Sequence, residues 1–420
     1  MSSLTWLAYS EAERRRTLDV IHMLGEPLTV DSIGIGRIRD AISDTLFPGT
    51  STIQTRARYF LIVPWVYRDL ERRSPLADAA DRARRAEHRL IEALLRGSDE
   101  AEADNSGVIG KYARQGLSTL PSSIYWQGLA KWGIRRYPGE IRSYHRLLAQ
   151  VDLRHPAVDD DGEALPGALG PAWDPHLPPE PEGLYETATL ELPRFEAAYL
   201  AERVTSSHPF SLLAEILAAG VDPAPAPYPW ALPPEVRGLL SERNLERLDH
   251  AELFSLIVHG AALLYNHMLA LEAGRAEREQ EYRAELGNWA HEVEANRARF
   301  EPWAEELDSL WRLVNDLNPR APGPLERRFV EDWIGLALRR HPAAVITDDQ
   351  ARELIADREY RLKRSNARLG NRSALEAWGG ASGTGRLDFR WSLVKRLVGD
   401  IRDGLEGPAD PLGVAEAAVA

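Results

Sequence analysis

TVDSIGIGRIRDAISDTLFPGTSTIQTRARYFLIVPWVYRDLERR, residues 29–73, holds the densest set of helix signals, turn signals and aromatic residues in the chain. In its first half, apolar residues recur at three- and four-residue spacing, which predicts a helix that ends at the Phe-Pro-Gly turn of residues 47–49. Ser51 and Gln54 form a capping-box pattern, so a second helix is expected from Ser51 onward. Pro64 should kink or end that second helix, because proline removes an intrahelical hydrogen bond.

Composition restricts the class of protein. The chain has 420 residues, 44% of them hydrophobic and 12 of them tryptophan, which is enough for two or more domains with apolar cores. A net charge of -13 excludes bulk attraction to nucleic acid or anionic membranes, although local basic patches can override that average. There is no cysteine, which fits a reducing cytoplasm. Because leader and membrane-span patterns are also missing, a cytoplasmic location without membrane contact is expected.

Helical periodicity along most of the chain predicts a mainly α, multi-helical fold. Two Pro-rich segments interrupt it, so we expect two helical domains joined by a Pro-rich connector. Isolated Trp173 and Trp230 indicate that this connector lies against a domain. The predicted division is an N-terminal helical domain over 1–155, the connector with a small helical insert over 156–234, a C-terminal helical domain over 235–405 and a disordered tail over 406–420.

Residues 107–145 contain a second informative pattern. A helix is predicted from about Ser122 to Trp132, and Gly133 stands where a C-terminal cap glycine belongs. Residues 134–137 read as a basic strand that turns at Pro138-Gly139. Helix, turn, helix and basic hairpin follow one another in a winged helix, so a winged-helix-like subdomain is one interpretation. An ordinary helical subdomain with its tryptophans in the core is the other.

Basic residues gather in two zones of this acidic chain. They outnumber acidic residues by eight to two over residues 107–154 and by twelve to six over residues 352–402. Such zones predict contacts with nucleic-acid phosphates or with an acidic partner, whereas solvated helical faces with salt bridges are the alternative. The residues expected to contact phosphates are Lys131, Arg135, Arg136, Arg56, Arg58, Arg386 and Arg390.

Sequence patterns for catalysis fail. The glycine-rich loop Gly379–Arg386 has glycines at phosphate-loop spacing but lacks the required Lys and Ser/Thr, so it is expected to be a flexible tip or a wing. His259 and His267 lie eight residues apart, not the four of helical zinc ligands, which favours core or interface histidines. No nuclease motif precedes any of the four lysines, and no nucleophile elbow occurs. The sequence predicts no catalytic residue, metal, cofactor or small-molecule substrate, although an enzyme with a site built from scattered residues stays open.

Four strings carry a family resemblance: LFPGTSTIQTRARYF, PWVYR, LPSSIYWQGLAKWGIRR and DFRW. They resemble an uncharacterised bacterial family, a domain of unknown function that covers nearly the whole chain and matches its first 150 residues best. The resemblance brings no catalytic residues and implies an association with helicases and nucleases in anti-phage gene clusters. Our first interpretation is therefore a non-enzymatic accessory protein of anti-phage defence that binds DNA through basic patches. The second is a helical scaffold or adaptor that docks a helicase or nuclease partner.

Overall fold

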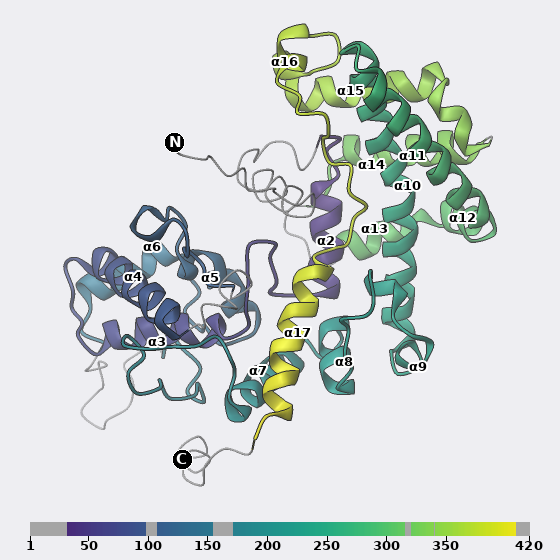
Figure 1. Cartoon of the computed structure of the whole chain (residues 1–420). Helices are drawn as coiled ribbons and strands as arrows, with labels where there is room; N and C mark the ends of the chain where they lie inside the picture. Colours follow the sequence, from purple (N-terminus) through teal and green to yellow (C-terminus); the bar gives the residue numbers. More distant parts are fainter. Residues whose placement is uncertain (1–31, 98–106, 154–170, 316–320, 340, 409–420) are drawn as a thin grey trace, which may run out of the picture. The chain divides into compact units, whose positions relative to one another are not determined.

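The computed structural model describes residues 32–97, 107–153, 171–315, 321–339 and 341–408. Within these ranges the chain forms sixteen α-helices and no β-strand, which confirms the mainly α, multi-helical prediction (Figure 1). The expected disordered tail lies, from residue 409 on, outside the described residues. The α-helices are α2 (Gly36–Leu46), α3 (Tyr59–Glu71), α4 (Ala79–Gly97), α5 (Pro121–Lys131), α6 (Ile141–Gln150), α7 (Arg194–Ser207), α8 (Leu212–Ala219), α9 (Pro234–Arg237), α10 (Glu242–Glu272), α11 (Ala276–Ala295), α12 (Arg297–Glu305), α13 (Leu307–Asn315), α14 (Pro324–Arg339), α15 (Asp349–Lys363), α16 (Arg372–Glu376) and α17 (Trp391–Glu406).

Two compact units divide the chain, and each is assembled from separated segments. Unit 1 combines the residues up to Ile42 with His250–Leu387, and unit 2 combines Ser43–Asp249 with the residues from Asp388 onward. This division differs from the linear order of domains expected from the sequence. The described part of the Pro-rich connector belongs to unit 2, and the helices expected in one C-terminal domain are shared between both units.

Helix α3 is the central helix of unit 2. Ten of its thirteen residues are buried, and it packs against α4 and α5. Of the kink or end predicted at Pro64, the end does not occur, because Pro64 lies inside α3, which continues to Glu71. Phe60 stacks on Trp132 with ring centroids 3.7 Å apart. The indole of Trp132 in turn donates a 2.9 Å hydrogen bond to the carbonyl of Pro48, which fixes the turn after α2 against this core.

The capping-box pattern after that turn does not start a helix. The backbone N–H of Ser51 donates to Gln54 Oε1 over 3.0 Å, as a capping box requires, but the Gln54 amide donates back to the carbonyl of Gly49 over 3.1 Å. These two bonds close a loop, and α3 begins only at Tyr59. The helix predicted from Ser51 was therefore wrong in its start, because the same side chain that caps a helix can also close a turn.

The region expected to be a winged helix keeps its helix but has no hairpin. Helix α5 and the positive φ of Gly133 agree with the prediction. The following segment does not fold back on itself, since the backbone N–H groups of Arg136 and Tyr137 donate to Ala172 over 2.8 and 3.1 Å. Arg135 forms an isolated antiparallel bridge with Trp173, and α6 takes the place of the second hairpin strand. Within the described residues, this region therefore lacks a wing.

Helices α7 and α17 complete unit 2, where they pack along each other (Figure 1). Gly404 of α17 permits this approach, because a Cβ there would lie 2.7 Å from Ala197 Cβ and 2.8 Å from the carbonyl oxygen of Leu192. Trp173 and Trp230 of the expected connector are both buried. This confirms the expectation that the segment lies against a domain.

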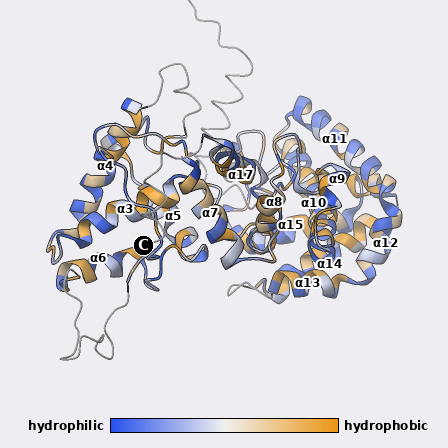
Figure 2. Cartoon of the chain, turned by 90° about the horizontal axis from the view of Figure 1, so that it is seen from below, coloured by the Kyte–Doolittle hydropathy of each residue, from blue (hydrophilic) through white to orange (hydrophobic). Residues whose placement is uncertain are grey.

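In unit 1, α10 is the core helix. It is the one described helix long and apolar enough to cross a membrane, but 94% of its apolar window is buried inside the protein. Indole N–H groups of two neighbouring helices donate to its backbone: Trp289 of α11 to Leu256 over 2.9 Å and Trp333 of α14 to Ile257 over 2.8 Å. Figure 2 shows both hydrophilic and hydrophobic residues on α11–α13, as expected of amphipathic helices that cover a core.

The glycine-rich loop Gly379–Arg386 lies against α10, so the prediction of a flexible tip was wrong. Asn266 of α10 donates its side-chain N–H to the carbonyl of Ser382 and accepts from the backbone N–H of the same residue, both over 2.8 Å. His259, also on α10, donates through Nε2 to the carbonyl of Thr384 over 3.0 Å. Two polar residues of α10 thus hold the backbone of this loop.

Candidate nucleic-acid interface

Two of the seven residues predicted to contact phosphates form structural ion pairs within unit 2. Arg58 is 7% exposed, and its Nε and Nη2 each lie 2.8 Å from a carboxylate oxygen of Glu196. Arg56 donates through Nε to both oxygens of Asp400 over 2.9 Å. Burial raises the pKa of Asp400, and the Arg56 guanidinium acts in the opposite direction. Both arginines are thus committed to carboxylates of their own chain.

The two arginines beside the glycine-rich loop also have carboxylate partners. Arg386 donates to Glu292 over 2.6 Å within unit 1. Arg390 donates to Asp44 over 2.6 Å and to the carbonyl of Thr50 over 2.7 Å within unit 2. Their side chains are only 15% and 11% exposed. Neither arginine presents an open guanidinium to a polyanion.

Arg135 stabilises the turn that follows α5. It is buried, lies over the ring of Trp126 at 4.6 Å and donates to the backbone carbonyls of Trp126, Tyr137 and Gly139. Burial lowers the pKa of Arg135 from its usual value. Its guanidinium therefore replaces the backbone hydrogen bonds that a hairpin would have made.

Lys131 and Arg136 remain on the surface. Lys131 is the last residue of α5, and its carbonyl, one of the last of that helix, accepts a 2.7 Å hydrogen bond from Nε2 of His208. Arg136 is 47% exposed at its side chain and donates through Nη2 to Asp174 over 3.0 Å. Of the seven predicted residues, the structure thus keeps these two accessible, five positions apart on one segment of unit 2.

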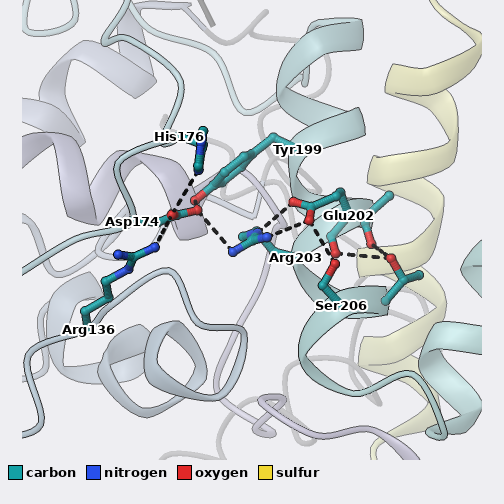
Figure 3. A network of polar contacts seen from close by, with 9 residues as sticks. Arg136, Asp174, His176, Tyr199, Glu202, Arg203 and Ser206 are labelled. Carbon is teal, nitrogen blue, oxygen red and sulfur yellow. Dashed lines mark hydrogen bonds and ion pairs between the residues drawn. The ribbon is translucent and has the colours of Figure 1, made fainter. Parts of the chain in front are cut away.

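Asp174 is the centre of a polar network beside them (Figure 3). Its carboxylate is fully buried, yet two arginines reach it: Arg136 at 3.0 Å and Arg203 at 3.2 Å. The hydroxyl of Tyr199 donates to Asp174 over 3.0 Å, and Nδ1 of His176 lies 3.6 Å away. A buried carboxylate with several partners is stable only while those partners stay in place, so Asp174 fixes the positions of its cations.

Local sequence explains how these groups meet. The bridge between residues 134–137 and 172–174 brings Asp174 beside Arg136, and the backbone N–H of Asp174 donates to Ile134 over 2.8 Å. Tyr199 and Arg203 lie four residues apart on α7 and therefore share one face of that helix. The same helix is capped by His208, the residue that contacts Lys131. Helix α7 thus links the two exposed cations.

We name this surface the Asp174 face and define it by the residues Lys131, Arg136, His176, Arg203 and His208 around Asp174. Burial and the nearby Asp174 charge raise the pKa of Tyr199 far above its usual range, so its hydroxyl stays a donor. Burial lowers the pKa of His208, which is therefore neutral at neutral pH. Glu202 pairs with Arg203, and this hydrogen bond holds the pKa of Glu202 below its usual value.

Sequence reasoning missed Asp174 and its partners on α7. Asp174 lies in a Pro-rich stretch, Pro171-Ala-Trp-Asp-Pro175, which reads as a connector without secondary structure. The available signal was Trp173, because a buried tryptophan in such a stretch indicates that the adjoining polar residue also packs against a domain. The spacing of Tyr199 and Arg203 gave no sign of a carboxylate 25 residues earlier.

Comparison with known proteins identifies the family. The family model that matches this chain covers residues 1–405 and is described as a family of unknown function, DUF6361. The chain belongs to this family. No curated protein matches it, and no solved structure matches it.

Proposed function

We propose that this member of the DUF6361 family binds nucleic acid through the sugar–phosphate backbone, with Lys131 and Arg136 of the Asp174 face as the principal contacts. One observation carries the proposal: an exposed arginine is held in place by a buried carboxylate, and a second exposed cation lies five residues earlier in the chain. A guanidinium held in this way loses less side-chain entropy when it meets a phosphate, and its planar fork suits phosphate oxygens.

The net negative charge of the chain restricts where and under what conditions nucleic acid can bind. A net charge of -13 repels polyanions at long range, so binding depends on the local face and must be sensitive to salt. A face of this size neutralises about two or three phosphates, and affinity should then fall roughly 7- to 40-fold between about 50 and 200 mM salt. Contacts to the backbone alone predict little preference for base sequence.

An accessory role beside a helicase or nuclease in anti-phage defence is part of the proposal. Such a partner needs its strand held while it acts, and a modest, sequence-independent backbone contact supplies that. The family is one of unknown function and assigns no residue to this role.

Fluorescence anisotropy with labelled single-stranded and duplex 20-mers tests the proposal. Binding at low salt should weaken at least about tenfold in the Lys131→Gln/Arg136→Gln variant, since each phosphate contact is worth roughly a factor of several. Arg372→Gln removes the same kind of charge from a side chain that is 94% exposed in unit 1, so it is the matched control. Equal loss in both variants, or no binding at low salt, would refute the role of the Asp174 face.

A second function, docking of a helicase or nuclease partner, is favoured by one separate observation in unit 1. Helices α14 and α15 border a pocket of about 280 Å³, where Leu325 is 59% exposed. Tyr360, on α15, is 58% exposed. Exposed large apolar side chains of this kind mark surfaces where an amphipathic helix of a partner can bind. Leu325→Asp should abolish co-elution with a purified helicase or nuclease partner and leave DNA binding unchanged, whereas retained co-elution would exclude this pocket.

A further inference from the structure

A cavity in unit 1 lies beside the glycine-rich loop, away from the residues used above. It has a volume of about 220 Å³ and is lined by three segments: the start of the described chain, one face of α10 and the loop itself. Ile33, Val258 and Leu387 provide apolar walls, and Arg39 and His259 provide polar groups. A concave apolar site with a few convergent polar groups is the usual form of a small-ligand site.

The loop has backbone N–H groups without an acceptor in the described part of the chain, and two of them belong to Gly383 and Gly385, which line the cavity. The N–H of Ser382 is used by Asn266, but the N–H groups of Gly383, Thr384 and Gly385 donate to no residue in the described part of the chain. Gly383 has a φ of +62°, a conformation that suits glycine and turns the backbone sharply. Successive amides in such a turn form a concave donor surface for anions.

Arginines surround the same loop. Arg39 lines the cavity, and Arg368 donates to the hydroxyl of Ser382 over 2.7 Å. A Cβ on Gly380 would lie 3.4 Å from Arg278 and 3.5 Å from Arg275, so two further guanidinium groups lie against the start of the loop. Some of this charge is balanced: Arg39 donates through Nε and Nη2 to Asp40 over 3.0 and 2.9 Å, and Arg278 donates to Glu281 over 2.7 Å. The loop itself contains no acidic residue.

The loop is also held in a fixed shape, as a binding site requires. Asn266 and His259 of α10 form hydrogen bonds to its backbone, and the hydroxyl of Tyr282 on α11 donates to the carbonyl of Gly380 over 2.6 Å. Burial lowers the pKa of His259, so its ring is neutral at neutral pH and leaves Nδ1 as an acceptor. These contacts preorganise the loop without a ligand, which reduces the entropy that binding costs.

We propose that this cavity binds a small organic anion, with a carboxylate or phosphate head on the amides of residues 383–385 and Arg39, and a short branched apolar body against Ile33, Val258 and Leu387. The volume is below the roughly 300–1,000 Å³ of pockets for drug-sized ligands, which excludes a nucleotide. The ligand class goes beyond the proposed nucleic-acid function and rests on residues of the other unit.

Calorimetric titration of the full chain with four probes tests this inference: isovalerate, isopentyl phosphate, inorganic phosphate and isopentanol. We expect isovalerate or isopentyl phosphate to bind at one site per chain, and the tighter of the two identifies the head group. Inorganic phosphate should bind at least about tenfold more weakly, because it lacks the apolar body. Isopentanol lacks the anion and should not bind. Isopentanol binding as tightly as isovalerate would refute the anion site.

Two variants locate the site. Ala262→Leu fills the cavity from α10, where Ala262 is 8% exposed, and should abolish binding of the tighter probe. Arg39→Gln should weaken it at least about tenfold through loss of a charge-assisted hydrogen bond. Gly379→Ala is the control, because a Cβ there meets no atom within 4 Å. Binding of neither organic anion, or binding unchanged in Arg39→Gln, would overturn the proposal, while Arg136→Gln should leave it intact.

Discussion

Replacing Asp174 tests whether its buried carboxylate holds the Asp174 face together. In Asp174→Ala, the hydroxyl of Tyr199, on a residue only 9% exposed, loses its acceptor, which costs about 1–3 kcal/mol. Arg136 is half exposed and regains water, so its pair contributes no more than about 1 kcal/mol. Arg203 keeps Glu202, which accepts its Nε–H over 2.7 Å. We therefore expect unit 2 to lose about 1–4 kcal/mol of unfolding free energy.

The assay is guanidinium denaturation followed by tryptophan fluorescence, because Trp173 adjoins the substituted residue. Asp249→Ala is the control in the same unit: its side chain is 53% exposed and lies 3.9 Å from Arg237, so as a surface substitution it should change stability by less than about 0.5 kcal/mol. A loss in Asp174→Ala no larger than in this control would refute the reasoning.

DNA binding by Asp174→Asn separates positioning from charge. This variant removes one negative charge and keeps the shape of the side chain. If only the local charge matters, binding becomes tighter. If Asp174 positions Arg136, as we infer, binding becomes weaker even though the protein is less acidic.

Three further outcomes are expected from buried groups. Arg58→Ala should cost about 3–5 kcal/mol by stranding the buried Glu196, while Arg58→Met/Glu196→Leu should restore most of it, as measured by denaturant titration. Burial raises the pKa of Glu87 from its usual 4.5 to about 7, against two hydrogen bonds from the next helix. The folded state therefore binds this proton more tightly than the unfolded state does. The resulting stability is fully present below about pH 4.5 and should be lost as the pH rises through about 7. Glu87→Gln should flatten this decline, as measured by denaturation midpoints from pH 4 to 8. Gly260→Ala should cost about 1–3 kcal/mol or more in thermal unfolding, because the added Cβ would overlap the indole of Trp289, and an unchanged melting temperature would contradict that packing.

Local signals were enough to predict several helices. Periodic apolar residues and a terminating turn identified α2, and a cap glycine identified the end of α5. The predicted wing failed because residues 134–137 bond to residues 172–174, almost forty positions later. The sequence of a strand-like segment does not show which segment it pairs with. Residues 134–137 are therefore equally compatible with a hairpin and with the observed bridge.

The site prediction failed for a similar reason. A count of charges in the sequence finds the arginines but not the carboxylates that pair with them. Those carboxylates are distant in sequence: Asp400 lies 344 residues from Arg56, and Glu196 lies 138 residues from Arg58. Exposure therefore could not be inferred for any single arginine. The glycine-rich loop shows the same limit, since its attachment depends on Asn266, 116 residues before Ser382.

The separated segments of unit 1 have a consequence for biosynthesis. Arg358 donates to the backbone carbonyls of Ile33 and Gly34, 325 and 324 residues earlier in the chain. At a translation rate of roughly 5–20 residues per second, the N-terminal segment waits roughly 16–65 s on the ribosome before this partner is made. Folding of unit 2 likewise cannot be completed until its last helix, α17, has been synthesised. The segment around Ile33 and Gly34 thus lacks its Arg358 partner for most of elongation, so we expect the nascent chain to bind ribosome-associated chaperones.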